Sequence, residues 1–203
     1  MTVLSTQTLF RHAAWDNPWW VNENRNAGRY NYPGRESTQY LCWHPLGVTA
    51  EFLRHLGPEA AGDLEEMRLR LWAMQVDLAG LPEVTFDNAE SFGVTAEDLV
   101  TDNYAATQKL AQSLRADGHA GLVAPSAALP GTRISVLFGP RLLSSWQRTP
   151  LDELQVATAH AMDGFPVIEV VPYVRWFGDS HASLEQWRAT GSFDPFDDPL
   201  VAR

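Results

Sequence analysis

The side chains with the chemistry of an active site are concentrated between residues 28 and 51. This stretch holds Arg29, Glu51 and three tyrosines, of which Tyr30 and Tyr40 are the candidates for a site. A planar guanidinium binds phosphate or sugar oxygens, a carboxylate stabilises positive charge that develops on a reacting group, and tyrosine rings stack against a flat ligand or enclose it. The competing interpretation is a structural ion pair, because most Arg and Glu side chains in proteins are solvated or paired.

A turn and a strand carry the tyrosines. The Pro-Gly pair that follows Asn31 is typical of a turn, and residues 38–43 are typical of a strand. Because side chains alternate along a strand, Tyr40 and Cys42 share one face. Cys42 has no evident partner for nucleophilic chemistry, so we interpret it as a buried strand residue.

A helix carries the carboxylate. Pro45 suits the first turn of this helix, and Gly57-Pro58 is expected to end it. Residues three and four positions apart are neighbours on a helix surface. By this spacing Val48 and His55 are neighbours of Glu51, and Phe52, which follows it directly in the sequence, is counted as the third. Glu51 is therefore expected at the margin of an apolar face, where its carboxylate can face a cleft.

Ser126 is a candidate from a distant part of the chain. It follows a short buried strand at residues 122–124, and the next strand is expected at residues 134–138. Loops that leave a sheet often contact ligands. The other interpretation is that the Ser126 hydroxyl satisfies the backbone of the turn, and the two roles are compatible.

The two stretches together resemble the RES family, the toxins of RES-Xre toxin–antitoxin modules, which is named after an Arg, a Glu and a Ser. The family's turn Gly-Arg-Trp/Phe-Asn-x-Pro-Gly is similar to residues 28–34, with Tyr30 in place of the Trp or Phe. Its Tyr-Leu strand resembles Tyr40-Leu41, and its Thr-Ala-x-Glu helix start resembles residues 49–51. Its Gly-Leu-x-x-Pro-Ser-Ala motif is similar to residues 121–127. The resemblance covers roughly residues 9 to 140.

The resemblance implies an activity. RES toxins resemble ADP-ribosyltransferases in fold and break the nicotinamide–ribose bond of NAD, passing ADP-ribose to water, to inorganic phosphate or, in some members, to a protein. It implies catalytic roles for Glu51 and Arg29. It also implies substrate-binding roles for Tyr30, Tyr40, Ser126 and Arg11, the last because RES proteins often begin with an apolar–Arg pair.

The implied ligands and partners follow from the same family. NAD is expected as a substrate, with no cofactor and no metal, and inorganic phosphate or water as the acceptor of ADP-ribose. An Xre-type antitoxin is the expected protein partner. Two alternatives stay open. One is an ADP-ribosyltransferase that modifies a host protein, which would share every named residue, and the other is an interaction domain without enzymatic activity that keeps an NAD pocket.

The remaining elements predict a mixed α/β fold (α+β): a single domain at residues 1–191 with a central, bent, mostly antiparallel β core flanked by helices. Short strands separated by turns favour this fold over repeated strand–helix alternation. Further strands are expected at residues 3–12, 67–78 and 167–176, helices at 103–116 and 183–190, and either type at 151–161. The tail at residues 192–203, rich in Asp and Pro, is expected to be mobile or to dock on a partner.

Composition excludes several classes of function. With 15 basic and 25 acidic residues, the net charge of −10 disfavours direct binding to nucleic acid or to a membrane surface. An anionic ligand therefore needs a local basic pocket. The single cysteine and the lack of a long apolar run predict a cytoplasmic protein. No zinc, serine-hydrolase or dinucleotide-fold motif is present, and we interpret Asp179-Ser180-His181 as loop composition.

Overall fold

The fold is built on one antiparallel sheet. The computed structural model describes residues 6–13, 18, 24–35, 37–59, 64, 66–139, 159–164 and 167–201. Its strands are β1 (Thr6–His12), β2 (Thr38–Cys42), β3 (Leu69–Asp77), β4 (Gly121–Pro125), β5 (Arg133–Phe138) and β6 (Ala159–Gly164). Its helices are α1 (Pro45–Leu56), α2 (Ala105–Ala116) and α3 (Ala182–Thr190), with short 3-10 helices η2 (Ala89–Phe92) and η4 (Ile168–Tyr173).

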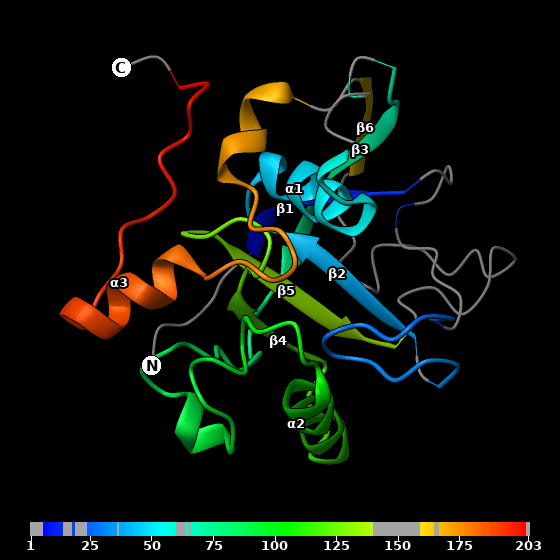
Figure 1. Ribbon diagram of the computed structural model, residues 1–203. Coiled ribbons are helices and arrows are strands. Elements are labelled where there is room, and N and C mark those ends of the chain that lie inside the picture. The colour runs from blue at the N-terminus through cyan, green and yellow to red at the C-terminus, as the bar shows by residue number, and fades with distance from the viewer. Residues whose placement is uncertain are drawn as a thin grey trace, which may run out of the picture.

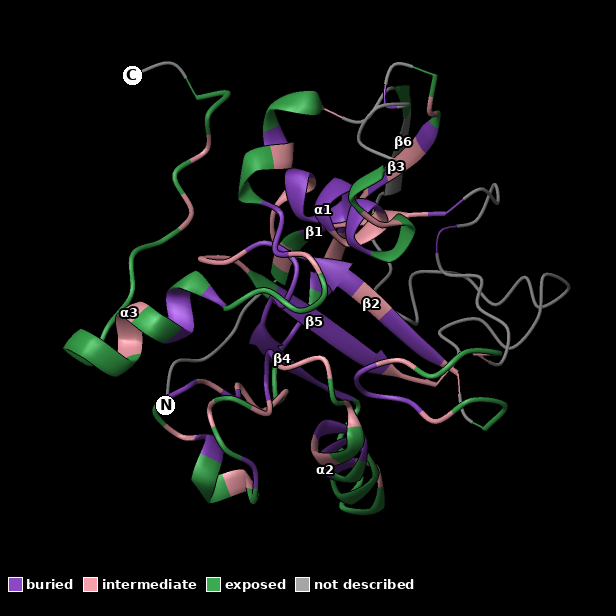
Figure 2. Cartoon of the chain, viewed as in Figure 1, coloured by how far each residue is buried: buried purple, intermediate pink, exposed green. Residues whose placement is uncertain are grey.

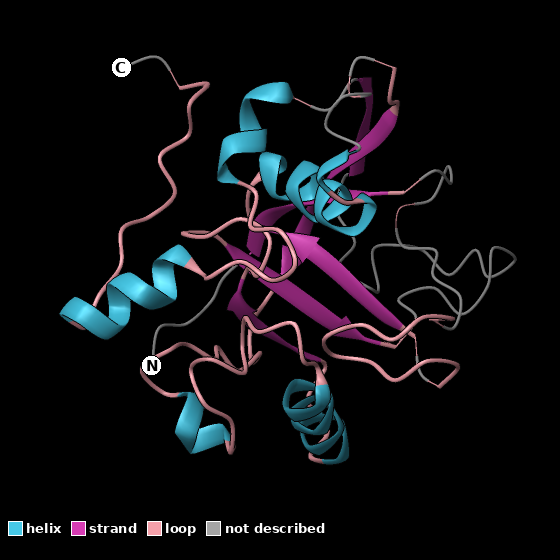
Figure 3. Cartoon of the chain, viewed as in Figure 1, coloured by secondary structure: helices cyan, strands magenta, loops and turns pink. Residues whose placement is uncertain are grey.

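The strand order explains how residues distant in sequence meet. The six strands lie in the order β4-β5-β2-β1-β3-β6, and each neighbouring pair is antiparallel (Figure 1). Helices lie around this sheet (Figure 3). The predicted mixed α/β fold with an antiparallel core is confirmed, because a doubly wound sheet would be parallel. The central strand β2 lies between β5 and β1, with Tyr40 opposite Val136 and Cys42 opposite Phe10.

The two faces of β2 pack into different parts of the core. Cys42 belongs to a cluster that also takes Val48 from α1 and Leu184 from α3, and Tyr40 packs against that cluster. Leu41 belongs to a second cluster with apolar side chains of β1 and β3. The alternation predicted for this strand is therefore confirmed. One face of β2 is turned toward the helices, which is where a site shared with α1 has to form.

Helix α1 begins and ends where the sequence predicts. The Nδ1 atom of His44 accepts a hydrogen bond from the Leu46 amide at 3.2 Å, which caps the start, and Gly57 ends the helix with a φ of +95°. Leu46, Ala50 and Leu53 are buried against the segment after β4 and against η4. Most of α1 is accordingly buried (Figure 2). One stripe of the helix is thereby fixed in the core, and Glu51 is left at its edge.

The strand predicted at residues 167–176 is wrong. Residues 168–173 form the 3-10 helix η4, and Pro172 lies inside it. Val170 and Val174 are the buried apolar residues of this segment, while Ile168 and Tyr173 are exposed. Burial thus recurs every four residues, which is a helical spacing, although the β-branched composition favours a strand. The last strand of the sheet is instead β6, which pairs with β3.

Some predictions fall partly outside the described residues. Strand β1 is described from Thr6, and residues 1–5 lie outside the description. Within 151–161, residues 159–161 belong to strand β6, and 151–158 are not described. The predicted strand at 67–78 is confirmed as β3, and both predicted helices are confirmed as α2 and α3.

The tail after α3 has contacts on the domain itself. The Phe196 amide donates a hydrogen bond to the Gly131 carbonyl at 3.1 Å, and the Phe196 ring lies edge-on to His44 and Tyr173. Gly131 has a φ of +83°, and a Cβ there would lie 2.5 Å from the Phe196 nitrogen. This turn therefore requires glycine because the tail backbone passes so close to it. Mobility of the tail stays a prediction.

Candidate active site

A cavity of about 720 Å³ opens where β1, β2, α1 and the segment before β2 meet. Four of the six residues named from the sequence line it: Arg11, Arg29, Tyr40 and Glu51. The other lining residues are Phe10, His12, Asn24, Arg25, Asn26, Ala27, Gly28, Asn31, Thr38, Cys42, Val48, Phe52, Arg54, His55, Tyr104 and Ile134. All three neighbours predicted for Glu51 are among them. The volume suits a ligand of the size of a nucleotide or dinucleotide.

The turn that carries Arg29 is held by its neighbours. Gly28 and Asn31 exchange backbone hydrogen bonds of 3.1 and 3.3 Å, so Arg29 and Tyr30 form the tip of a tight turn. From α2, the side-chain amide of Gln108 donates to the carbonyls of Gly28 and Asn31, at 3.0 Å each. A Cβ on Gly28 would lie 2.6 Å from the Tyr40 hydroxyl oxygen, so only glycine allows this approach.

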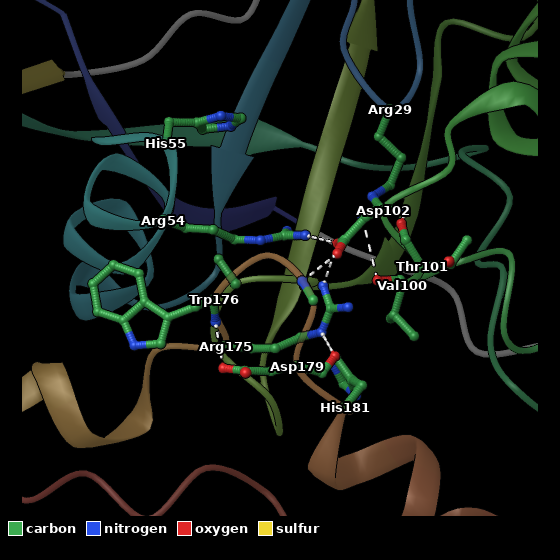
Figure 4. A network of polar contacts seen from close by, with 12 residues as sticks. Arg29, Arg54, His55, Val100, Thr101, Asp102, Arg175, Trp176, Asp179 and His181 are labelled. Atoms are coloured by element: carbon green, nitrogen blue, oxygen red, sulfur yellow. Dashed lines mark hydrogen bonds and ion pairs between the residues drawn. The ribbon is translucent and has the colours of Figure 1, made fainter. Parts of the chain in front are cut away.

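Arg29 points from the turn toward the loop that precedes α2. Its guanidinium donates to the carbonyl of Thr101 at 2.7 Å and more weakly to those of Asp98 and Val100. It also lies over the ring of Tyr104 at 4.8 Å. Figure 4 shows Arg29 beside this loop. The side chain is only 6% exposed. Arg29 therefore ties the turn to the loop and forms part of the cavity wall at the same time.

The two tyrosines have different places. The Tyr40 hydroxyl accepts from the Tyr30 amide at 2.9 Å and donates to Asn31 Oδ1 at 2.8 Å, while its ring lines the cavity. Tyr30 is fully buried in the core cluster and does not line the cavity. Burial raises the pKa of Tyr30 to about 12. Tyr30 therefore packs behind the turn, since its ring fills the core, and the substrate contact expected for it stays a prediction.

The carboxylate of Glu51 has few polar contacts with the described part of the protein. Among the described residues its one ion-pair contact is with His55 Nε2, at 4.0 Å, and its side chain is 30% exposed. No ion pair joins Glu51 to Arg29 within the described part of the chain. The interpretation of these two residues as a structural ion pair therefore has no support in the geometry. The carboxylate remains available to a ligand in the cavity.

Arg11 enters the cavity from β1. Its guanidinium donates to the Pro18 carbonyl at 2.9 Å and to Gln39 Oε1 at 3.2 Å. Burial lowers the pKa of Arg11 to about 10, which still leaves it charged at neutral pH. Burying a charge is costly unless it is paired, so a positive group kept here favours an anionic ligand.

Arg54 is a cavity residue that the sequence reasoning missed. It lies three positions after Glu51 on α1, is 2% exposed and forms an ion pair with Asp102 at 2.5 Å. The signal was present in the helix spacing, because a residue three positions along shares the face of Glu51. Together Arg11, Arg25, Arg29 and Arg54 line the cavity beside one acidic side chain, Glu51. An acidic protein thus has the local basic pocket that an anionic ligand needs.

Ser126 does not line this cavity. Its Oγ accepts hydrogen bonds from the amides of Ala128 and Leu129 at 3.3 and 3.1 Å, and its carbonyl contacts His181 Nε2 at 2.9 Å. Ala128 and Leu129 pack on the buried stripe of α1. Arg29, Tyr40 and Glu51 thus meet at one cavity, whereas Ser126 closes a turn that supports the helix of Glu51, because its hydroxyl satisfies the turn backbone. The substrate-binding role expected for Ser126 stays a prediction.

Comparison with known proteins agrees with the motifs. A model of the RES domain matches residues 7–156. This chain belongs to the RES domain family. It is 32% identical, over 114 residues, to the protein named "Probable NAD(+) phosphorylase Rv3189" from Mycobacterium tuberculosis (strain H37Rv). The match covers 56% of this RES chain and 54% of the relative, so the chain spans about half the length of the curated relative it matches.

A solved structure shows the same fold. A chain in the crystal structure of the M. tuberculosis MbcT–MbcA toxin–antitoxin complex superposes with a TM-score of 0.61 at 20% sequence identity. The match covers 85% of this chain and 91% of that one. At this identity the likeness establishes the fold alone. In the described part of this RES domain, no helix has both the length and the apolar character needed to cross a bilayer.

Proposed function

We propose that this RES protein is an enzyme that cleaves the nicotinamide–ribose bond of NAD and transfers ADP-ribose to inorganic phosphate or to water. The observation that carries the proposal is the cavity, which places the Glu51 carboxylate among four arginines. NAD is a dinucleotide with a negatively charged diphosphate and a positively charged nicotinamide end. Arginines suit the diphosphate and a carboxylate suits the nicotinamide ribose. The name of the mycobacterial relative supports the same substrate.

Glu51 has the central role in the proposed reaction. As the bond between C1″ of the nicotinamide ribose and the nicotinamide nitrogen breaks, its electron pair goes to nicotinamide and the sugar becomes cationic. A fixed carboxylate stabilises that cation in the transition state more than it stabilises the bound substrate. An oxygen of phosphate or water then bonds to C1″, and a water acceptor releases its proton to the solvent. Nicotinamide leaves as a neutral molecule, so no strong general acid is required.

The protein contributes position and electrostatics, and NAD is consumed as a substrate rather than held as a cofactor. The ring of Tyr40, together with Phe52, gives the cavity flat or apolar surface beside Glu51. Such surface suits the nicotinamide ring. The acceptor in this proposal is phosphate first, since the relative's name is that of a phosphorylase, with water as the second acceptor.

An NAD-consuming enzyme harms the cell that makes it, so its activity has to be restrained. The proposal therefore includes a role as the toxin of a toxin–antitoxin module. It also includes an Xre-type antitoxin as the partner. The likeness in fold to a chain of a toxin–antitoxin complex supports this role.

One experiment tests the reaction. The purified protein is incubated with NAD, with and without inorganic phosphate, and the products are resolved by chromatography and mass spectrometry. We expect release of nicotinamide in both cases, and ADP-ribose 1″-phosphate only when phosphate is present. Intact NAD after long incubation would contradict the proposal. Attachment of ADP-ribose to a protein would identify a transferase instead.

A further inference from the structure

Asp102 joins three parts of the chain beside the cavity. One of its carboxylate oxygens accepts hydrogen bonds from Arg54 Nη2 at 2.5 Å and from Arg175 Nη1 at 2.7 Å. The other accepts from the Gly178 amide at 2.7 Å. Figure 4 shows both guanidinium groups meeting at this carboxylate. Asp102 therefore fixes the end of the Arg54 side chain relative to two other segments.

The charges in this cluster do not cancel. Two guanidinium groups share one carboxylate, which leaves one positive charge in excess. Arg175 does not line the cavity, and its Nε donates instead to the Asp179 carbonyl at 3.0 Å. Arg54 does line the cavity. Because Asp102 is shared with Arg175, it neutralises Arg54 only in part, and Arg54 presents positive charge to the cavity, where Glu51 is the nearby opposite charge.

The Arg54 side chain also has an unused donor. Its Nε is buried without a hydrogen-bond partner among the described residues. Its guanidinium carbon lies 4.3 Å from the centre of the Phe177 ring. Burial lowers the pKa of Arg54, and the nearby Glu51 charge acts in the opposite direction. A buried guanidinium that is only partly hydrogen-bonded is costly, and an anion bound beside it would offset that cost.

The loop of Asp102 holds a second cavity arginine as well. Arg29 donates to the carbonyls of residues 98, 100 and 101, and Arg54 pairs with the Asp102 side chain. Two arginines that come from different elements are thereby oriented by one short loop. Preorganised guanidinium groups are the usual means of binding phosphate, because their planar donors match phosphate oxygens.

We propose that Arg54 binds a phosphate group in the cavity and that Asp102 is the positioning residue that holds Arg54 for this contact. The proposal rests on the proposed function for the identity of the ligand. The phosphate belongs either to the diphosphate of NAD or to inorganic phosphate that acts as the acceptor. Both sources offer phosphate oxygens to the guanidinium, and the KM values for NAD and for phosphate distinguish them.

The test compares Arg54→Gln and Asp102→Asn with the wild-type protein. Asp163→Asn is the matched control, because Asp163 also pairs with an arginine, Arg70 at 2.8 Å, but is exposed and outside the cavity lining. The KM for NAD is measured in the absence of phosphate, and the KM for phosphate at saturating NAD. Thermal unfolding of each variant checks that it is folded.

We expect Arg54→Gln to raise one of these KM values about tenfold to a hundredfold, the usual range for losing a hydrogen bond to a charged group. We expect kcat to change much less. A rise in the KM for NAD assigns Arg54 to the NAD diphosphate, and a rise only in the KM for phosphate assigns it to the acceptor. A fall in kcat with both KM values unchanged would overturn the proposal.

The role of Asp102 is tested by combining the two substitutions. If Asp102 acts through Arg54, Asp102→Asn raises the same KM value, and adding it to Arg54→Gln causes no further rise. Full additivity of the two effects would overturn the positioning role.

Calorimetry separates this proposal from the proposed function. Wild-type protein and Arg54→Gln are titrated with ADP and with inorganic phosphate, which requires no turnover. Weaker binding of either probe by Arg54→Gln supports the proposal even if the wild-type protein leaves NAD intact. Equal binding of both probes would overturn it even if NAD is cleaved.

Discussion

The hydroxyl of Tyr40 is already occupied by the protein. It accepts a hydrogen bond from the Tyr30 amide and donates one to Asn31 Oδ1. Both bonds go to the turn that carries Arg29. Burial raises the pKa of Tyr40 above its ordinary value, and the hydroxyl therefore stays neutral at physiological pH. Any contact of Tyr40 with a ligand must come from its ring. The same residue thus shapes the cavity and fixes the backbone of the turn.

At the residue scale, the first prediction concerns Glu51. Glu51→Gln keeps the shape of the side chain and removes its charge, which matters most when the sugar becomes cationic. We expect kcat to fall about a hundredfold to a thousandfold, the usual cost of losing one well-placed electrostatic stabiliser. We expect NAD affinity to change little. A nicotinamide-release assay and isothermal titration with NAD measure the two effects.

The matched control is Glu90→Gln, which removes an exposed carboxylate outside the cavity lining. It is expected to leave both turnover and affinity unchanged. Near-normal turnover of Glu51→Gln would mean that Glu51 is a helix residue beside a pocket, and the NAD-cleaving proposal would lose its main support.

Arg29 leads to a different expectation. Arg29→Lys keeps the charge but cannot reproduce a planar fork that reaches three carbonyls of the 98–101 loop. We expect weaker NAD binding and a free energy of unfolding lower by about 1 to 3 kcal/mol, because carbonyls lose donors. Titration with NAD and chemical denaturation measure these changes. Unchanged stability together with unchanged affinity would show that a point charge is sufficient at this position.

At the scale of elements, His181 connects the start of α3 to the end of β4. Its Nδ1 accepts from the Leu184 amide at 3.2 Å, so the proton is on Nε2, which donates to the Ser126 carbonyl. Burial is the main cause that lowers the pKa of His181, to about 4 from 6.5. Between about pH 4 and pH 6.5, the imidazole is therefore neutral in the folded protein but protonated in the unfolded chain.

This difference predicts a pH dependence of stability. Because the pKa is lower in the folded state, the His181 contribution is complete above pH 6.5 and is lost as the pH falls toward 4. The loss amounts to at most about 3 kcal/mol. His181→Gln is expected to be less stable at pH 7 but to have a flatter profile between pH 6.5 and 4. Chemical denaturation at several pH values tests this, and equal slopes for the two proteins would contradict it.

The sequence predicts the elements around the cavity well because local signals there agree with the fold. Alternation assigns the faces of β2, and Pro45 and Gly57 mark the ends of α1. The signals failed at η4, where β-branched residues favour a strand but the burial has a helical spacing. Composition also cannot reveal which segment pairs with β3. That position in the sheet is taken by β6, and this depends on the tertiary structure.

The candidate site was predictable in part for the same reason. Arg29, Tyr40 and Glu51 are close in sequence, so a turn, a strand and a helix bring them together. Ser126 is distant, and its motif does not reveal whether its hydroxyl faces a ligand or its own turn. The partnership of Arg54 with Asp102 depends on tertiary packing and has no signature in the sequence.

At the scale of the whole molecule, the charge distribution has two parts. The chain carries a net charge of −10, while its main cavity is lined by four arginines and one glutamate. The acidic surface disfavours non-specific binding to nucleic acid, and the basic cavity concentrates the attraction for anions at one place. This contrast favours a small anionic substrate over a polymeric one. It is also consistent with an enzyme whose substrate is abundant and diffusible.

The last prediction concerns the effect of this activity in a cell. If the protein consumes NAD, expression of the wild-type chain without an antitoxin should lower intracellular NAD and stop growth, because NAD is needed for central metabolism. Glu51→Gln should relieve both effects at the same level of expression, whereas the control Asp163→Asn should be as harmful as the wild type. Enzymatic cycling assays of NAD and growth curves after induction measure the outcome.

Normal growth with unchanged NAD at high wild-type expression would contradict the toxin proposal. Growth arrest with unchanged NAD would instead indicate that the protein harms the cell by another route. In that case, arrest that persists in Glu51→Gln would show that this route does not depend on the Glu51 carboxylate.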